Sequence, residues 1–306
     1  SSRILWGKPP SQGNIFPELI STIHGFTRVH AYPVVMSVTE SSFQAIEWTR
    51  DGLRLLDQRR LPGETRYLLF TEAAPVAAAI RDLVVRGAPA IGITAAYAVV
   101  LSAKRHRDRD SDDWQAVVAA DIDVLAAARP TAVNLVWALE RMRTCVLHLR
   151  GDPVTALLDE ARRIHAEDVA ANHRMGDSGA DLIKTGDSVL TYCNTGSLAT
   201  GGYGTALGVV RSAWTAGKLQ DVYAGETRPW LQGARLTAWE LVQDAIPVTL
   251  ITDNAASALM QAGKVQWVIT GADRVTANGD VINKIGTSQL AISCRHYGVR
   301  MMVVAP

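Results

Sequence analysis

Residues 188–208 read Ser188-Val-Leu-Thr-Tyr-Cys193-Asn-Thr-Gly196-Ser-Leu-Ala-Thr200-Gly-Gly-Tyr-Gly204-Thr-Ala-Leu-Gly208. They predict a short buried strand, a glycine-rich turn and a helix that begins near Thr205. The N–H groups and the positive dipole end at the start of such a helix favour a phosphate. Cys193 would lie at the carboxyl end of the strand, where ligands bind in open α/β sheets. The alternative interpretation is a tight turn with a small buried cysteine.

Two common nucleotide motifs do not fit this stretch. Gly-x-Gly-x-x-Gly would begin at Gly202, but position 207 is Leu, and Gly-x-x-x-x-Gly-Lys-Ser/Thr does not occur. The sequence therefore favours a phosphate here without suggesting NAD or ATP.

The composition excludes several classes of protein. A chain of 306 residues with 48% apolar and 20% charged residues is typical of a soluble globular protein. Its net charge of +1 gives no reason to expect a nucleic-acid or membrane partner, and no apolar run approaches the roughly 18 to 20 residues of a membrane span. The three widely spaced cysteines indicate a reducing compartment, which we take to be the cytoplasm. No cluster of histidines or cysteines has the spacing of a metal site.

The sequence divides into three parts. Residues 1–35 contain Pro9-Pro10 and no sustained period, and we expect a disordered leader. Residues 36–184 predict a mainly helical domain with a small antiparallel sheet. Residues 185–306 alternate strands with helices, which predicts an α/β, Rossmann-like parallel sheet covered on both faces. The expected strands are 188–193, 221–226, 247–252, 265–270 and 300–304, and the expected helices are 205–216, 233–244, 254–262 and 287–297.

Polar residues follow the expected strands at their carboxyl ends. They are Cys193, Glu226-Thr-Arg228, Asp253-Asn254 and Asp273. Helix capping would explain Asp253 or Asn254 alone, but a shared site explains the whole set better. Asp273, partly removed from water, is a candidate general acid or base; the alternative is a salt bridge to Arg274 or a loop cap.

Several cations and amides are candidates for binding a phosphate and sugar hydroxyls, although a surface position is the alternative for each. They are Arg86, Arg129, Arg228, Arg235 and Lys284, with Gln232 and Asn283 as hydroxyl partners.

Seven blocks of the sequence carry a resemblance to a known family. They are Leu55–Arg59, Arg86-Gly-Ala-Pro-Ala-Ile-Gly92, Arg129-Pro-Thr-Ala-Val-Asn-Leu135, Cys193-Asn-Thr-Gly-Ser-Leu-Ala-Thr200, Glu226–Glu240, Gly271-Ala-Asp-Arg-Val275 and Asn283-Lys-Ile-Gly-Thr287. In this order they resemble the methylthioribose-1-phosphate isomerase family. Its superfamily also holds the α, β and δ subunits of translation initiation factor 2B and archaeal ribose-1,5-bisphosphate isomerase.

The resemblance implies an aldose–ketose isomerase of methionine salvage that acts on a sugar phosphate, usually as a homodimer and without a metal or organic cofactor. It implies Asp273 as the proton donor and Cys193 as a proton shuttle or transition-state stabiliser. The implied substrate contacts are Arg86, Gly87, Ala88, Arg129, Gln232, Asn283 and Lys284.

Two alternatives remain open: a ribose-1,5-bisphosphate isomerase, and a non-catalytic regulatory subunit like those of initiation factor 2B. The sequence also departs from the family at both ends. Residues 1–35 have no recognised counterpart, and the chain stops at Pro306, where the family continues. We therefore expect a C-terminally short form.

Overall fold

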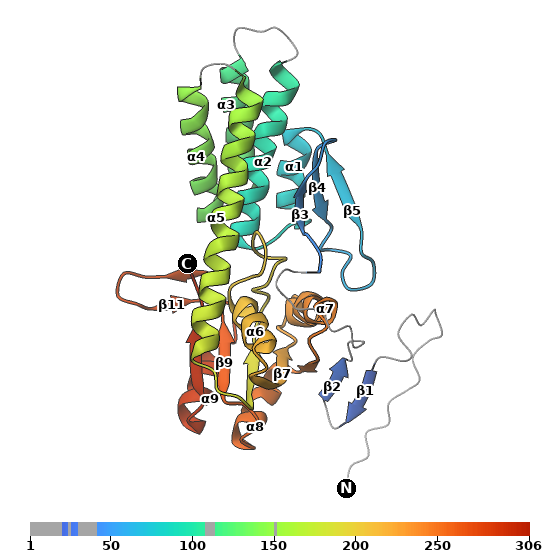
Figure 1. Ribbon diagram of the computed structural model, residues 1–306, viewed down its shortest axis with the longest axis vertical. Coiled ribbons are helices and arrows are strands. Elements are labelled where there is room, and N and C mark those ends of the chain that lie inside the picture. The colour runs from blue at the N-terminus through green and yellow to red at the C-terminus, as the bar shows by residue number, and fades with distance from the viewer. Residues whose placement is uncertain (1–19, 24–25, 30–41, 108–113, 150–151) are drawn as a thin grey trace.

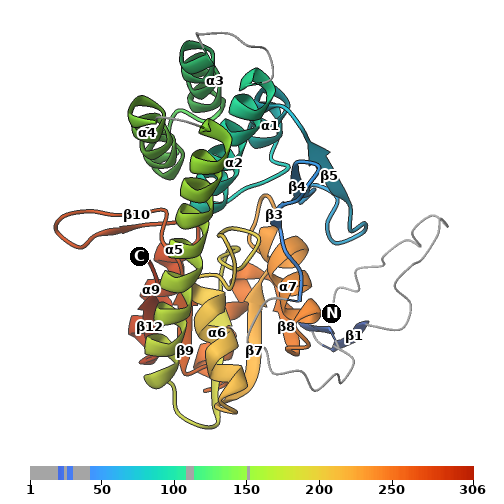
Figure 2. The same cartoon turned by 45° about the horizontal axis from the view of Figure 1, so that its top comes forward.

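The computed structural model describes residues 20–23, 26–29, 42–107, 114–149 and 152–306 (Figure 1). A helical part lies above a parallel sheet, and the long helix α5 (Pro153–Asp181) runs from one to the other (Figures 1 and 2). α5 packs against α2 (Ala88–Arg107) in the first part and α6 (Ala206–Thr215) in the second. One helix thus joins the two parts.

The helical part is built around α2. Its run of alanine and aliphatic residues is buried from Ala90 to Ala103, because α1 (Ala73–Arg81), α3 (Trp114–Ala128), α4 (Val133–His148) and α5 all pack on it. A small antiparallel sheet lies against these helices and consists of β3 (Ile46–Trp48), β4 (Leu53–Leu56) and β5 (Tyr67–Phe70). This confirms the predicted helical region with a small sheet.

The second part contains the predicted parallel sheet. Its five parallel strands run in the order β8-β7-β6-β9-β12. They are β6 (Asp187–Thr191), β7 (Leu219–Gly225), β8 (Val248–Ile251), β9 (Trp267–Thr270) and β12 (Arg300–Val303). The chain moves outward from β6 to β7 and β8, then returns to β9 on the other side of β6. The topological switch point therefore lies between β6 and β9, where open sheets bind ligands.

Helices cover both faces of this sheet, because neighbouring residues of each strand point to opposite faces. Val189 packs with α5, α6 and α7 (Ala238–Gln243) on one face. Leu190 packs with α8 (Ala256–Gln261) and α9 (Thr287–Tyr297) on the other. All five residues of β6 are buried, which agrees with the predicted buried strand, although only Val189 and Leu190 of the five are apolar.

Three features differ from the sequence prediction or extend it. Within the expected disordered leader, β1 (Ile20–Ile23) and β2 (Phe26–Val29) form strands, and β2 pairs antiparallel with β8. The backbone groups of β8, at the edge of the parallel strands, accept this partner. The rest of the expected leader lies outside the described residues.

The other two features lie in the second part. A hairpin of β10 (Arg274–Val275) and β11 (Val281–Ile282) projects from the body near α5 (Figure 1). The expected helix 233–244 begins as the π-helical segment η1 (Gly233–Thr237) before it continues as α7. Among the helices the structure describes, none is both long and apolar enough to cross a membrane.

Candidate active site

The candidate site lies at the switch point, beyond the carboxyl ends of β6 and β9. Thr191 of β6 is aligned with Ile269 of β9, so the chains leave the sheet side by side. Their loops then touch: a Cβ atom placed on Gly271 would come within 2.7 Å of Thr195 Cγ2. The segments that carry Cys193 and Asp273 are therefore adjacent.

Cys193 has an unusual backbone conformation. Its φ is +68°, a left-handed value that a residue with a Cβ rarely adopts. The Cys193 N–H donates to Thr227 Oγ1 at 3.0 Å, and Thr237 Oγ1 donates to the Cys193 carbonyl at 2.6 Å. The side chain of Gln232 donates through Nε2 to Cys193 Sγ at 3.4 Å. The thiol is thus held in one direction at the end of the strand.

Arg86 lies beside the thiol, and the charges of two further arginines act on Arg86. Burial lowers the pKa of Arg86, the Cys193 thiol beside it acts in the opposite direction, and the charges of Arg235 and Arg129 lower it further. Arg86 Nη1 also donates to Asn194 Oδ1 at 3.5 Å. Three guanidinium groups close enough to influence one another form a cationic site that suits a phosphate.

The helical part contributes one wall of the site. Gly87, with φ of +95°, lies so close to the glycine-rich loop that a Cβ atom would come within 2.3 Å of the Ala199 carbonyl oxygen. Ala90 N–H donates to the same oxygen at 3.2 Å, near the N-terminus of α2. Gln58 Nε2 donates to the Leu198 carbonyl at 2.7 Å. The positive end of α2 therefore points toward this loop.

The sequence suggests a phosphate site at the N-terminus of α6, but two N–H groups there bond to the chain itself. The N–H groups of Thr205 and Leu207 donate to the Thr195 carbonyl at 2.9 and 3.5 Å. These two N–H groups are therefore not free to bind an anion.

A buried ionic network supports the glycine-rich loop from below. Glu240 accepts the N–H groups of Ser197 and Leu198 at 2.7 and 3.2 Å, and Asn194 Nδ2 donates to it at 2.8 Å. Arg211 donates to Glu240 at 3.0 Å and to Asp244 at 2.5 Å, with all three side chains fully buried. Burial raises the pKa of Glu240, and the Arg211 charge opposes this.

Helix α5 holds the far end of the same loop. His165 Nε2 lies 2.7 Å from the Gly201 carbonyl, and Asp168 accepts the Gly201 N–H at 2.7 Å. Asn172 Nδ2 donates to the Gly202 carbonyl at 3.0 Å. The spacing of these three residues puts them on one helix face. Sequence reasoning missed both supports; a signal for the ionic network was Arg211, a charge inside the apolar run of α6.

The structure brings together some of the predicted site residues. Gln232 is 2% exposed, and its Oε1 atom has no hydrogen-bond partner among the described residues. Arg129 is half-buried at the turn between α3 and α4, and Ala88 begins α2. Both lie on the side of the site formed by the helical part.

The remaining predicted residues lie at the β10–β11 hairpin. Asp273 is exposed, and its N–H donates to the Ile282 carbonyl at 2.9 Å. The expectation that this carboxylate is partly removed from water is wrong for this structure, because the hairpin projects from the body. Asn283 and Lys284 are half-buried after β11, and Asn283 Nδ2 donates to Thr287 Oγ1 at 3.1 Å.

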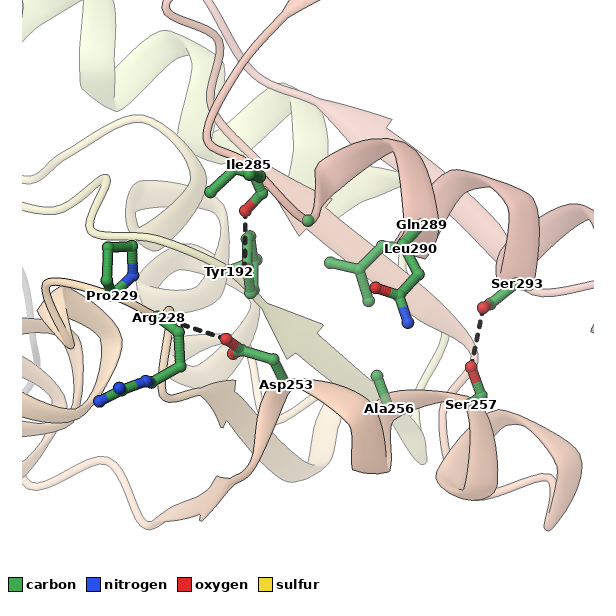
Figure 3. Close-up of a pocket in the computed structure, with 11 residues that line it drawn as sticks. Tyr192, Arg228, Pro229, Asp253, Ala256, Ser257, Ile285, Gln289, Leu290 and Ser293 are labelled. Carbon is green, nitrogen blue, oxygen red and sulfur yellow. Dashed lines mark hydrogen bonds between the residues drawn. The ribbon is translucent and has the colours of Figure 1, made fainter.

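Arg228 and Asp253 line a neighbouring cavity of about 320 Å³ on the α8–α9 side of the sheet (Figure 3). Tyr192 and Ile285 form part of its wall, and Tyr192 donates through its hydroxyl to the Ile285 carbonyl at 2.9 Å. Within the described ranges, no group of three or more His, Cys, Asp or Glu side chains is arranged to hold a metal ion.

Comparison with known proteins identifies the family. Residues 84–306 match the initiation factor 2 subunit family. A methylthioribose-1-phosphate isomerase of Methylococcus capsulatus is 61% identical over 266 residues, which are 87% of this chain and 76% of that protein. The isomerase of Thioalkalivibrio sulfidiphilus is 58% identical over 274 residues, 89% of this chain and 78% of the relative.

Two solved structures share the fold and much of the sequence. The 5-methylthioribose 1-phosphate isomerase of Pyrococcus horikoshii has a TM-score of 0.82 and 42% identity, over 86% of this chain and 75% of that one. A structure described as translation initiation factor eIF-2B, subunit delta, from A. fulgidus has a TM-score of 0.81 and 44% identity, over 86% and 78% of the two chains. This chain belongs to the methylthioribose-1-phosphate isomerases within the initiation factor 2 subunit family.

Proposed function

We propose that the protein converts 5-methylthioribose 1-phosphate into 5-methylthioribulose 1-phosphate, with Cys193 and Asp273 as the catalytic residues. The observation that carries this proposal is the setting of the thiol. Cys193 lies at the switch point of the sheet, between the Gln232 amide and the Arg86 guanidinium. Relatives that are 56–62% identical carry the isomerase name.

The reaction requires a ring opening before hydrogen can move. Asp273 gives a proton to the ring oxygen as the bond from that oxygen to C1 breaks, and a proton returns to Asp273 from the C2 hydroxyl. The C2 hydrogen passes to C1 beside Cys193, either as a proton carried by the thiol or as a hydride. C2 becomes the ketone, and no atom is gained or lost.

The binding residues divide between the two parts of the substrate. Arg86, Arg129 and Lys284, with the Gly87-Ala88 backbone at the start of α2, hold the phosphate. Gln232 and Asn283 hold sugar hydroxyls. Gln232 Oε1, which has no partner within the part of the chain that the structure describes, supports this by offering an acceptor. We place the enzyme in the cytoplasm as a homodimer, with no cofactor.

Turnover of 5-methylthioribose 1-phosphate by the purified protein tests this proposal. We expect Cys193→Ser and Asp273→Asn to lower kcat by a factor of about 10² to 10⁴, the usual contribution of a positioned acid or base. Cys294→Ser is the matched control, because Cys294 is buried in α9, outside the proposed site. Circular dichroism checks folding. Full activity in either folded site variant would contradict the assigned roles.

The same assay separates the alternative functions. The similarity to a structure described as an initiation factor subunit is the reason to test a regulatory role as the alternative. A folded parent protein that binds the sugar phosphate without converting it would favour that role. A parent protein that ignores this sugar and converts ribose 1,5-bisphosphate would favour the second isomerase.

A further inference from the structure

The hydroxyl of Thr227 both accepts and donates a hydrogen bond next to Cys193 in the candidate site. It accepts the Cys193 N–H at 3.0 Å and donates to the Gly225 carbonyl at 3.2 Å. Thr227 is fully buried, so water cannot replace either bond. A valine of similar shape would make neither bond, whereas a serine would make both.

Thr227 itself has a strained backbone that a second group stabilises. Its φ is +62°, which is rare for a β-branched residue. The Asp253 carboxylate accepts the N–H of Thr227 through Oδ1 and the N–H of Arg228 through Oδ2, each at 2.7 Å (Figure 3 shows the second of these). These two charge-assisted bonds hold the turn after β7 in its unusual conformation.

These bonds form a continuous path from Asp253 to Cys193. Asp253 fixes the Thr227 backbone, the Thr227 hydroxyl fixes the Cys193 N–H, and Cys193 keeps a left-handed φ of +68°. A relaxation of that φ would rotate the thiol away from Gln232 and Arg86. Thr237, the last residue of η1, donates a hydrogen bond from its hydroxyl to the Cys193 carbonyl.

We propose that Thr227, fixed by Asp253, is a positioning residue that keeps the Cys193 thiol against Gln232 and Arg86. The catalytic consequence rests on the proposed function, but the conformational consequence does not. Thr227 does not touch the reacting atoms and acts through Cys193.

Thr227→Val and Thr227→Ser test the proposal. We expect Thr227→Val to lower kcat about tenfold with an unchanged KM, and Thr227→Ser to restore it, because only the hydroxyl bonds differ. Thr94→Val is the matched control: Thr94 is also fully buried, but in α2, where its hydroxyl has no partner among the described residues. An unchanged kcat in a folded Thr227→Val protein would overturn the proposal, as would an equal loss in Thr94→Val.

A measurement independent of turnover separates this proposal from the proposed function. The rate of Cys193 alkylation by iodoacetamide is measured by mass spectrometry of the Cys193 peptide. We expect alkylation to be about tenfold slower in Thr227→Val, because the thiol has rotated away from the positive charge of Arg86. An unchanged or faster reaction would overturn the proposal even if the parent is an active isomerase. A slower reaction in a protein without isomerase activity would support the positioning role and reject the function.

Asp253→Asn keeps the test decisive if Thr227→Val does not fold. It removes one of the two bonds to the turn, because the amide nitrogen of Asn cannot accept an N–H, and the other bond loses its charge assistance. We therefore expect losses of kcat and alkylation rate in the same direction. No loss in either measurement would overturn the role of Asp253 and, with it, the path to Cys193.

Discussion

At the scale of single residues, hydrogen bonds from side chains hold the backbone of the candidate site in an unusual conformation. Cys193, with its φ of +68°, is the example described above. A second local feature is the ion pair between Asp57 and Arg59. Asp57 is 2% exposed, and Arg59 donates to its two oxygens through Nε and Nη2, each at 2.8 Å. The carbonyls of Gln58 and Arg59 then accept from Arg235 Nη2, both at 3.1 Å. This pair therefore helps to place one of the arginines near the thiol.

The Asp57–Arg59 pair predicts a pH-dependent stability. The hydrogen bond from Arg59 holds the pKa of Asp57 below its usual 3.8, although burial opposes it. A lowered folded-state pKa stabilises the fold fully above 3.8, and this contribution is lost as the pH falls below 3.8 through the folded-state pKa. We expect Asp57→Asn to lower the free energy of unfolding by about 1 kcal/mol at neutral pH, because Arg59 is partly exposed.

Urea unfolding at neutral pH and at several pH values below 3.8 measures this effect. The difference between the parent and Asp57→Asn should shrink as the pH falls. Asp82→Asn, whose side chain is 56% exposed, is the control and should change little at any pH. A difference that stays constant across the range would contradict the assignment.

At the scale of elements, the buried ion pairs join α6 and α7 beneath the glycine-rich loop. Removing one partner leaves an uncompensated charge in the core, which costs about 3 to 5 kcal/mol. Glu240→Ala should therefore lower the free energy of unfolding by about 3 kcal/mol and also lower activity, because Ser197 and Leu198 lose their acceptor.

Thermal and chemical unfolding measure that loss. Glu140→Ala is the comparison, because the Glu140 side chain is 63% exposed and its ion pair with Arg143 spans 3.7 Å. It should cost less than about 0.5 kcal/mol. Equal effects of the two substitutions would argue against a structural role for the buried network.

The elements themselves were largely predictable from the sequence. The inner strand β9 is buried along its whole length, so it reads as a short apolar run. Gly217, Gly263 and Gly298 mark the ends of the helices between the strands. The β10–β11 hairpin gave no such signal, because its two strands have two exposed residues each. The charge of Arg211 stands out within α6, but its partner Glu240 could not be predicted, because the two residues lie 29 positions apart and meet only when α6 and α7 pack.

At the scale of the whole molecule, the candidate site is made where the helical part meets the parallel sheet. Gly87 lies at this junction, against Ala199 of the glycine-rich loop. Sequence reasoning selected Gly87 through a family resemblance, and the tight contact gives a physical reason for a glycine. The exposed position of Asp273 could not be foreseen, because it depends on the direction of the hairpin.

Gly87→Ala tests the importance of this junction. Gly87 and Gly186 have similar φ values of +95° and +87°, so the backbone strain of an alanine should cost about 1 kcal/mol of stability at either position. A Cβ atom at Gly186 has nothing within 4 Å among the described residues, whereas one at Gly87 clashes with Ala199. We expect Gly87→Ala alone to lower kcat/KM by about tenfold or more. Equal kcat/KM in the two variants would contradict this role of the junction.

The central claim is that a sugar phosphate binds between Cys193 and Asp273 at the switch point of the sheet. A crystal structure of Asp273→Asn with 5-methylthioribose 1-phosphate tests it most directly. We predict that the phosphate contacts Arg86, Arg129 and Lys284, with C1 and C2 beside the Cys193 thiol and the ring oxygen facing position 273. A substrate bound instead in the cavity lined by Arg228 and Asp253 would contradict the claim.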